Sequence, residues 1–200
     1  MKLIISILSI GCFFSVSAQE VKEKIAEKKY EGYSYIDAIA IYEKVAEKGH
    51  VSVELFQKLG DSYYFNGMLD KSKVWYDKLF QMENQTFDPE YYFRYSQSLK
   101  AVKAYKEADK MMEKFYALTN DYRGELYVKN KLYLVDINNS LDKFTITDAG
   151  INSEFSDYGG YFKDTKMYFV SNRIPQKNNK KIDKWTNQNF LNIYRAEFSD

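Results

Sequence analysis

The fold of this chain is decided by residues 55–79, LFQKLGDSYYFNGMLDKSKVWYDKL, together with the segment just before them. Six positions of that earlier segment return 34 residues later with side chains of similar size: Ile25 as Leu59, Ala26 as Gly60, Tyr30 as Tyr64, Ala38 as Ser72, Tyr42 as Tyr76 and Val45 as Leu79. A unit of this length is a pair of helices, which cannot bury its apolar face alone. The sequence therefore predicts stacked helix pairs with an open side that can receive a partner.

The period and the residue pattern are those of a tetratricopeptide repeat (TPR). The first helix of such a repeat carries large, large, small and large residues at fixed places, and these are Phe56, Leu59, Gly60 and Tyr63 here. Ser72 is the small residue of the second helix. Because Gly60 and Ser72 are small, the two backbones can approach closely, and we expect Gly60→Arg to separate the pair.

A third copy follows at a spacing of 36, because two extra residues fall in the loop at 83–88. Its matching residues are Tyr92, Tyr95, Ser96, Leu99, Tyr105, Ala108 and Met112. We expect three helix pairs within residues 19–120, with helices at about 20–31, 35–48, 52–66, 69–82, 89–102 and 105–118. Asp88 precedes Pro89 in the order of an N-cap and a first helical residue. Residues 121–142 are expected to form one or two helices that cap the array.

The composition changes after residue 142, where Asn, Ser, Asp, Gly and aromatic residues become frequent. Alternating apolar residues predict strands at about 143–148, 166–171 and 191–197. Gly159-Gly160 and the polar stretch 176–184 are expected to connect them. The predicted fold class is therefore α+β and mainly α, with a TPR-like helical-repeat solenoid followed by a partial antiparallel β segment.

The N-terminus has the layout of an export signal. Lys2 precedes an apolar run from Leu3 to Phe14, and small residues follow at Val16 and Ala18. This pattern predicts that residues 1–18 are a signal peptide cleaved after Ala18, and the run is too short for a permanent membrane span.

A competing interpretation makes Cys12 a lipid acceptor, since residues 8–12, LSIGC, loosely resemble a lipobox. Two features oppose it: Ser9 stands where an aliphatic residue is expected, and the apolar run continues beyond Cys12.

The charges of the chain nearly cancel. There are 29 Lys and Arg against 28 Asp and Glu, and one of the lysines, Lys2, lies in the predicted signal peptide. A neutral chain has no electrostatic basis for nucleic-acid binding. The only cysteine also lies in residues 1–18, so the mature chain would contain no disulfide and would depend on packing for its stability.

Several stretches together resemble a known family. Residues 151–159, INSEFSDYG, followed by 166–173, KMYFVSNR, resemble the opening of a WD40-like propeller blade, and residues 184–194, KWTNQNFLNIY, resemble its continuation. Placed after the repeats with YIDAI at 35–39 and LFQKLGDSYY at 55–64, this order resembles the start of OmpA-family cell-envelope proteins. Such proteins have a TPR array, a WD40-like propeller and a C-terminal peptidoglycan-binding domain.

The resemblance implies an exported, non-enzymatic scaffold that binds protein partners at the periplasmic face of the outer membrane. Peptidoglycan would be bound only through a domain that no segment here resembles. Residues 143–200 would be an incomplete blade, and a single blade leaves faces and edges in water, so we expect a fragment of a longer protein.

Two alternatives stay open. The chain could be the recruitment region of a larger cell-wall-processing enzyme whose catalytic domain lies beyond residue 200. It could also be a complete short TPR protein with a frayed tail.

The sequence contains few of the residues and motifs that are typical of enzyme active sites. His50 is the only histidine and stands in the turn Lys48-Gly49-His50, where a solvated role is expected. There is no HExxH, Walker or GxSxG motif. We therefore expect no catalytic, cofactor-binding or metal-binding residues. Asp157, within the blade-like motif, is expected to stabilise a turn through hydrogen bonds.

A partner groove is the better-supported use of the repeats. If the first helix of each pair lines it, equivalent turns should supply Glu27, Tyr30, Gln57, Asp61, Tyr64, Phe93, Gln97 and Lys100. Glu27 and Asp61 should repel a carboxylate, which argues against capture of a peptide C-terminus and for a segment held by tyrosines. The alternative is that these rings pack against neighbouring helices, as rings at helical spacing usually do.

Overall fold

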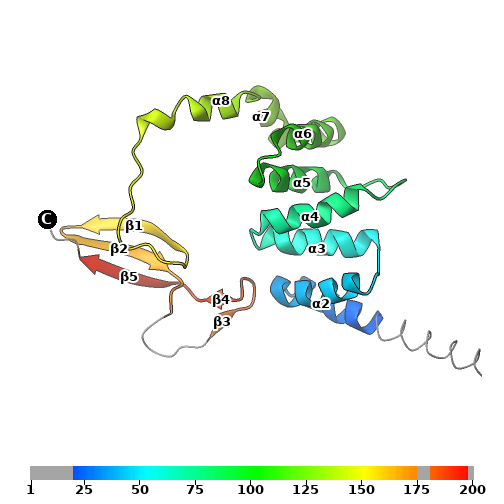
Figure 1. The fold of residues 1–200 in the computed structure, drawn as a ribbon, viewed down its shortest axis with the longest axis horizontal. Coiled ribbons are helices and arrows are strands. Elements are labelled where there is room, and N and C mark those ends of the chain that lie inside the picture. Colours follow the sequence, from blue (N-terminus) through cyan, green and yellow to red (C-terminus); the bar gives the residue numbers. More distant parts are fainter. Residues whose placement is uncertain (1–19, 175–180, 198–200) are drawn as a thin grey trace, which may run out of the picture. The chain divides into compact units, whose positions relative to one another are not determined.

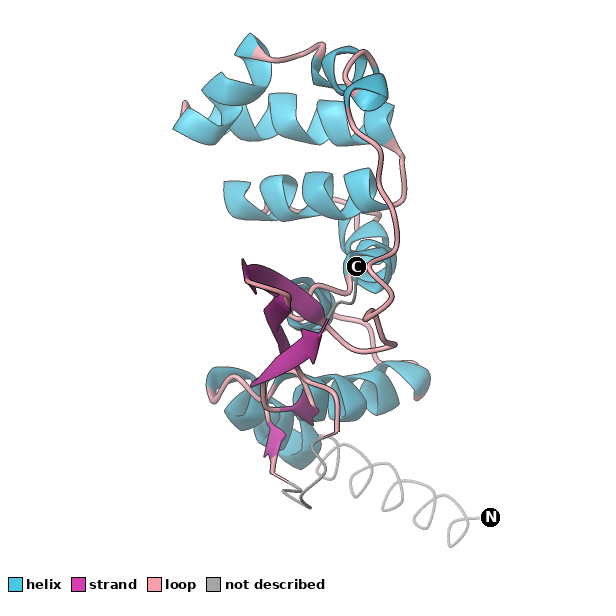
Figure 2. Ribbon diagram, turned by 90° about the vertical axis from the view of Figure 1, so that its left-hand side faces the viewer, coloured by secondary structure: helices cyan, strands magenta, loops and turns pink. Residues whose placement is uncertain are grey.

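The structure is a computed structural model that describes residues 20–174 and 181–197. The predicted signal peptide and Cys12 lie outside these residues. By its internal contacts the chain divides into two compact units, residues 1–131 and 132–200. In the described part, the strands all belong to the second unit (magenta in Figure 2).

The first unit is a stack of helix pairs. Residues 20–31 form an N-terminal helix. The others are α2 (Tyr35–Glu47), α3 (Val53–Phe65), α4 (Leu69–Phe80), α5 (Pro89–Ala101), α6 (Tyr105–Thr119) and α7 (Tyr122–Lys129). Each helix packs against the next along the chain (Figure 1). The six predicted helices are all present, with ends within two residues of the predicted ones, which confirms a TPR-like helical repeat.

The small residues of the second repeat lie where the pattern requires them. Gly60 is buried against the ring of Tyr76, and a Cβ added to it would lie 2.4 Å from Tyr76 Cε1. Ser72 Oγ donates a hydrogen bond of 2.9 Å to the main-chain oxygen of Gly60. Ser98 Oγ, from the third repeat, donates to Ser72 Oγ at 3.2 Å. Small side chains therefore bring three helices together around a continuous core.

Helix starts follow from local capping. The Ser52 side chain accepts a hydrogen bond of 3.1 Å from Leu55 N and so caps α3. Asp88 accepts one of 2.9 Å from Glu90 N, with Pro89 in the first turn of α5. This confirms the N-cap predicted from the order of Asp88 and Pro89.

The second unit is a small antiparallel sheet preceded by short helices. These are α8 (Tyr133–Asn138) and the 3₁₀ helix Leu141–Lys143. The sheet has the order β1-β2-β5, with β1 at Asp157–Lys163, β2 at Lys166–Ser171 and β5 at Asn192–Glu197. A separate hairpin joins β3 (Ile182–Asp183) and β4 (Gln188–Asn189). The predicted strands at 166–171 and 191–197 are confirmed.

Two strand-level predictions are wrong. Residues 144–148 form no strand, and Phe144 and Ile146 are 77% and 95% exposed, because an alternating pattern needs a partner strand to form a ladder. Gly159-Gly160 lies inside β1 rather than in a connection. The pairing of β1 with β2 shifts register between Tyr158 and Tyr161, and Gly159 has a φ of 68°. The glycine pair therefore allows an irregularity within the strand.

Asp157 holds the start of β1 in place. Its carboxylate accepts hydrogen bonds of 2.7 Å each from Ser153 N and Ser153 Oγ, and another of 2.7 Å from Arg173 Nη2. Hydrogen bonds from Ser171, Ser153 and Arg173 lower the pKa of Asp157 well below its usual range. The expected structural role of this aspartate is confirmed.

Candidate functional site

The candidate site is the face formed by the first helices of successive pairs, which we call the first-helix face: residues 20–31, α3, α5 and α7. The eight predicted groove residues lie on the first three of these helices. Hydrogen bonds between side chains 31 and 33 positions apart show that these helices lie side by side.

Asp61 on α3 is the centre of a buried polar network and is only 3% exposed. Its carboxylate accepts hydrogen bonds from Tyr30 at 3.2 Å, Tyr76 at 2.6 Å and Tyr91 at 3.4 Å. Arg94 Nη1 donates to Asp61 Oδ1 at 2.8 Å. Burial first, and the charge of Asp61 second, raise the pKa values of Tyr30 and Tyr76, so both hydroxyls stay protonated donors. The network joins three repeats.

The guanidinium of Arg94 is held on several sides. Its carbon lies 5.0 Å from the centre of the Phe65 ring and 5.6 Å from that of Tyr91. Glu90, one turn earlier on α5, approaches Arg94 Nε to 3.9 Å. A planar cation between rings and carboxylates is fixed in one orientation.

The same kind of ion pair recurs between each first helix and the next. Lys58 on α3 donates to Glu27 on the N-terminal helix at 2.6 Å, 31 residues away. The Asp61–Arg94 pair spans 33 residues. Arg123 on α7 binds Glu90 on α5 through two hydrogen bonds of 3.0 and 2.8 Å, again 33 residues away. We call these three pairs the ion-pair ladder.

The ladder corrects the electrostatic part of the groove prediction. Glu27 and Asp61 were expected to present free negative charge, but each pairs with a base on the next first helix. Burial opposes ionisation of Glu27, yet hydrogen bonds from Lys58 and Tyr42 lower its pKa. Each of the three bases of the ladder therefore already binds a carboxylate of the protein: Lys58 binds Glu27, Arg94 binds Asp61 and Arg123 binds Glu90. A partner therefore meets paired charges on this face and not a repulsive acidic surface.

The predicted residues of α5 are packed between helices. The Phe93 ring lies 5.4 Å from that of Phe115, with Arg123 at 4.3 Å from its centre. Gln97 Nε2 donates to Ser96 Oγ at 3.2 Å. Lys100 lies 5.9 Å from the centre of the Tyr127 ring, and burial lowers its pKa. For these three residues the packing alternative describes the geometry better than a groove does.

Gln57 and Tyr64 on α3 are both half-buried, and the Tyr64 ring packs in part against the hydrophobic core of the repeats. The Tyr64 ring contacts Phe65 edge to face at 5.6 Å. Tyr30, also half-buried, contacts Tyr35 edge to face at 5.4 Å and carries Lys58 over its ring at 4.2 Å. These side chains give the face an aromatic and uncharged character beside the ladder.

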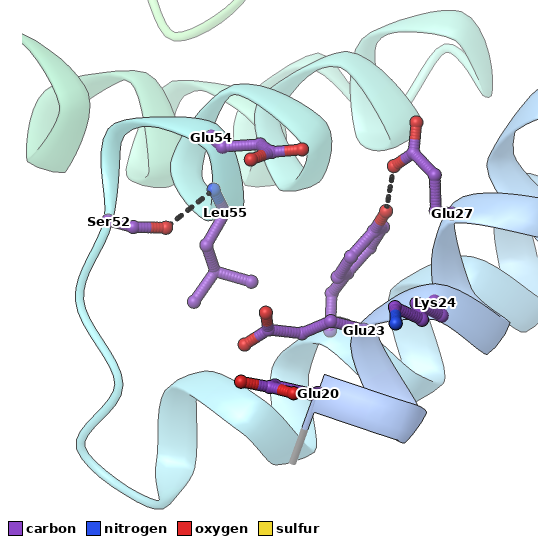
Figure 3. Close-up of a pocket in the computed structure, with 8 residues that line it drawn as sticks. Glu20, Glu23, Lys24, Glu27, Ser52, Glu54 and Leu55 are labelled. Carbon is purple, nitrogen blue, oxygen red and sulfur yellow. Dashed lines mark hydrogen bonds between the residues drawn. The ribbon is translucent and has the colours of Figure 1, made fainter. Parts of the chain in front are cut away.

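A pocket of about 230 Å³ lies where the N-terminal helix meets α2 and the start of α3. Its lining residues are Glu20, Glu23, Lys24, Glu27, Tyr42, Ser52, Glu54 and Leu55. Figure 3 shows carboxylates of the N-terminal helix and of α3 around one hollow. Sequence reasoning missed this pocket, although the helical spacing of Glu20, Glu23 and Glu27 was visible.

His50, expected to be solvated, is partly buried and has Nε2 3.3 Å from Glu23 Oε1.

Over 20–174 and 181–197, no three His, Cys, Asp or Glu side chains are grouped so that they could bind a metal ion. Within the same ranges, none of the helices has the length and apolar character to cross a bilayer.

No protein-family model matches this chain, and no curated protein matches it either. Among solved structures it is similar to the first TPR of Spaghetti (RPAP3) bound to HSP90 peptide SRMEEVD, at 15% identity over 59% of this chain and 93% of that chain, with a TM-score of 0.48. It is also similar to PcrH in complex with the chaperone binding region of PopB, at 16% identity over 55% and 88%, with a TM-score of 0.43. The Yersinia enterocolitica type III secretion translocator chaperone SycD aligns at 17% identity over 64% and 96%, with a TM-score of 0.43.

Proposed function

We propose that the first unit is a non-enzymatic scaffold that binds a protein partner on the first-helix face. The observation that carries this proposal is the ion-pair ladder, because it fixes successive first helices side by side and pairs their charges. A rigid face of this kind loses little conformational entropy when a partner binds. The partner would contact Tyr64 and Gln57, which lie half-buried at the surface of the middle helix.

The pairing of charges also limits the type of partner. A peptide C-terminus needs a free cation, whereas Lys58, Arg94 and Arg123 each bind a carboxylate of the protein itself. The partner we propose is an extended or helical segment held by aromatic contacts and neutral hydrogen bonds.

We further propose that the chain is exported and acts at the periplasmic face of the outer membrane, as the N-terminal part of an OmpA-like envelope protein. The layout of residues 1–18 and the order of helical repeats before an antiparallel sheet support this placement. The β1-β2-β5 sheet is also compatible with part of a propeller blade. Mass spectrometry of the protein from fractionated cells tests export, since cleavage after Ala18 gives a mature N-terminus at Gln19.

Partner capture tests the binding surface. Tyr64→Ala should reduce capture of the envelope partner by the full chain while circular dichroism shows that the chain is still helical, because the substitution removes the half of the ring that is exposed and leaves the buried core residues of α3 in place. Val74→Ala, an exposed position on the second helix α4, is the matched control and should leave capture unchanged. Unchanged capture by a folded Tyr64→Ala protein would contradict the proposal.

A further inference from the structure

The second unit contains a pocket of about 380 Å³ beside the β3–β4 hairpin. Its lining residues are Ser156, Tyr158, Asn172, Asp183, Thr186, Gln188, Asn189, Phe190 and Leu191. The volume falls in the range of small-molecule sites, roughly 300–1,000 Å³. The residues come from three separate segments of the chain, so the pocket exists only when the hairpin is docked on the sheet.

Asn172 holds those segments together and is only 4% exposed. Its Oδ1 accepts a hydrogen bond of 2.8 Å from Ser156 N, and its Nδ2 donates one of 2.5 Å to Gln188 Oε1. Its main-chain oxygen accepts one of 3.2 Å from Asn189 Nδ2. A buried residue whose Oδ1, Nδ2 and main-chain oxygen each make a hydrogen bond gives the pocket a fixed frame.

The frame sets the orientation of the two hairpin amides. Gln188 uses its oxygen and Asn189 uses its nitrogen to bind Asn172. The remaining atoms, Gln188 Nε2 and Asn189 Oδ1, form no hydrogen bond with any residue that the structure describes. One donor and one acceptor are thus presented on neighbouring residues, which suits hydroxyl groups because a hydroxyl both donates and accepts.

The residues that line the pocket disfavour ionic ligands. None of its lining residues is Lys, Arg or His. Asp183 is the one acid among them, and its carboxylate accepts hydrogen bonds from Thr186 Oγ1 at 2.8 Å, Thr186 N at 3.2 Å and Trp185 N at 3.3 Å. A phosphate or carboxylate would find no cation here, and a cationic ligand would compete with the turn that Asp183 stabilises.

Two aromatic rings supply the apolar part. Tyr158 and Phe190 line the pocket and are 53% and 55% exposed. Such rings lose water-exposed surface when the C–H face of a ligand packs against them. Aromatic surface beside a fixed donor and acceptor matches the mixed character of a pyranose, whose ring has apolar faces and hydroxyl edges.

From this arrangement we propose that the pocket binds a neutral carbohydrate, with hydroxyls on Gln188 Nε2 and Asn189 Oδ1 and a sugar ring against Phe190. A peptide strand is less well suited, because it would pair with the main-chain edge of β1 or β5 and these pocket groups are side chains. The proposal concerns the second unit and is independent of partner binding on the first-helix face.

The test titrates the full chain by calorimetry with cellotriose and, separately, with N,N′,N″-triacetylchitotriose. At least one should bind with a Kd of about 1 mM or tighter. Gln188→Glu keeps the oxygen that binds Asn172 but removes the free donor, and it should weaken binding at least about tenfold. Phe190→Ala should weaken it similarly without disturbing the frame. Ile193→Ala is the matched control, since Ile193 is exposed on β5 and outside the pocket, and it should bind like the unaltered chain.

Several results would overturn the proposal. Failure of both trisaccharides to bind would do so, as would binding that neither Gln188→Glu nor Phe190→Ala weakens. Inorganic phosphate or a neutral tripeptide binding more tightly than either sugar would also reject a carbohydrate site. Binding of only one trisaccharide supports the proposal and shows whether an acetamido group is required.

Discussion

Arg94 Nη1 lies 2.8 Å from Asp61 Oδ1, and this ion pair joins the first helices of two neighbouring repeats. The Asp61 side chain is 4% exposed and that of Arg94 is 21% exposed, so the pair is largely removed from water. Three tyrosine hydroxyls contribute further hydrogen bonds to the same carboxylate. Because this buried carboxylate has so many hydrogen-bond partners, it fixes the position of each repeat relative to the next. Its removal should strongly lower the stability of the first unit.

Asp61→Ala should therefore lower the free energy of unfolding of the first unit by about 3 kcal/mol, because Arg94 is left partly buried without its partner. Urea unfolding followed by circular dichroism measures this change. Glu83→Ala removes an exposed carboxylate in the loop after α4 and should change the free energy by less than about 0.5 kcal/mol. Equal effects of the two substitutions would show that the network does not stabilise the repeats.

Gly60→Ala should destabilise the second repeat by about 1–3 kcal/mol, because the added Cβ would lie 2.4 Å from the Tyr76 ring. This loss is expected although alanine favours a helix over glycine by about 1 kcal/mol. Thermal unfolding of the two proteins gives the comparison. Gly32→Ala is the comparison variant: its added Cβ would approach the main-chain oxygen of Lys28 to 3.2 Å, a milder contact than the 2.4 Å at Gly60, so it should cost less stability than Gly60→Ala. The close approach of α3 and α4 is refuted if Gly60→Ala is as stable as the unaltered chain.

Alkaline pH should unfold the helical unit. Burial raises the pKa values of Tyr30, Tyr42 and Tyr76, whereas tyrosines of the unfolded chain ionise near pH 10. Because the unfolded chain releases these protons first, the free energy of unfolding falls as the pH rises above about 10. Tyrosinate absorbance and helicity, recorded in the same titration, should show a fraction of tyrosines that ionise only as helix is lost. Complete ionisation with intact helices would contradict this burial.

Acid should weaken the sheet through Asp157. Hydrogen bonds from Ser171, Ser153 and Arg173 lower its pKa below the value of about 3.9 in an unfolded chain. Its contribution is therefore complete above about pH 4 and is lost as the pH falls further. Nuclear magnetic resonance signals of β1 and β2 report the stability of the sheet. At neutral pH the sheet should be less stable in Asp157→Asn than in the unaltered chain, and this difference in stability should become smaller in acid. A stability difference that does not change with pH would indicate that the charge of Asp157 does not stabilise the sheet.

The helical half could be predicted from the sequence because local signals agreed with the fold. The 34-residue spacing, small residues at Gly60 and Ser72, and the Asp88-Pro89 cap all describe neighbours in sequence or in one repeat. The strands were harder. Residues 143–148 alternate like a strand but lack a pairing partner, and Gly159-Gly160 has turn chemistry but is retained in β1 by pairing with β2. Strand identity depends on distant partners that a single segment does not reveal.

The candidate site was predicted less well, for a similar reason. Glu27 and Asp61 were placed on the correct helices, but their partners Lys58 and Arg94 lie 31 and 33 residues away, and no local pattern marks such pairs. Only superimposing one repeat on the next could have suggested them. The amides around Asn172 were missed because they meet through the docking of a hairpin on a sheet.

The central claim is that the first-helix face captures a protein partner, and photo-crosslinking in intact cells tests it most directly. A photoreactive residue at Gln57, half-buried on α3, should give a protein adduct of discrete mass that is lost in the Tyr64→Ala background. The same residue at Val74 on α4 should give no such adduct. An adduct from Val74 alone, or none from Gln57, would contradict the account.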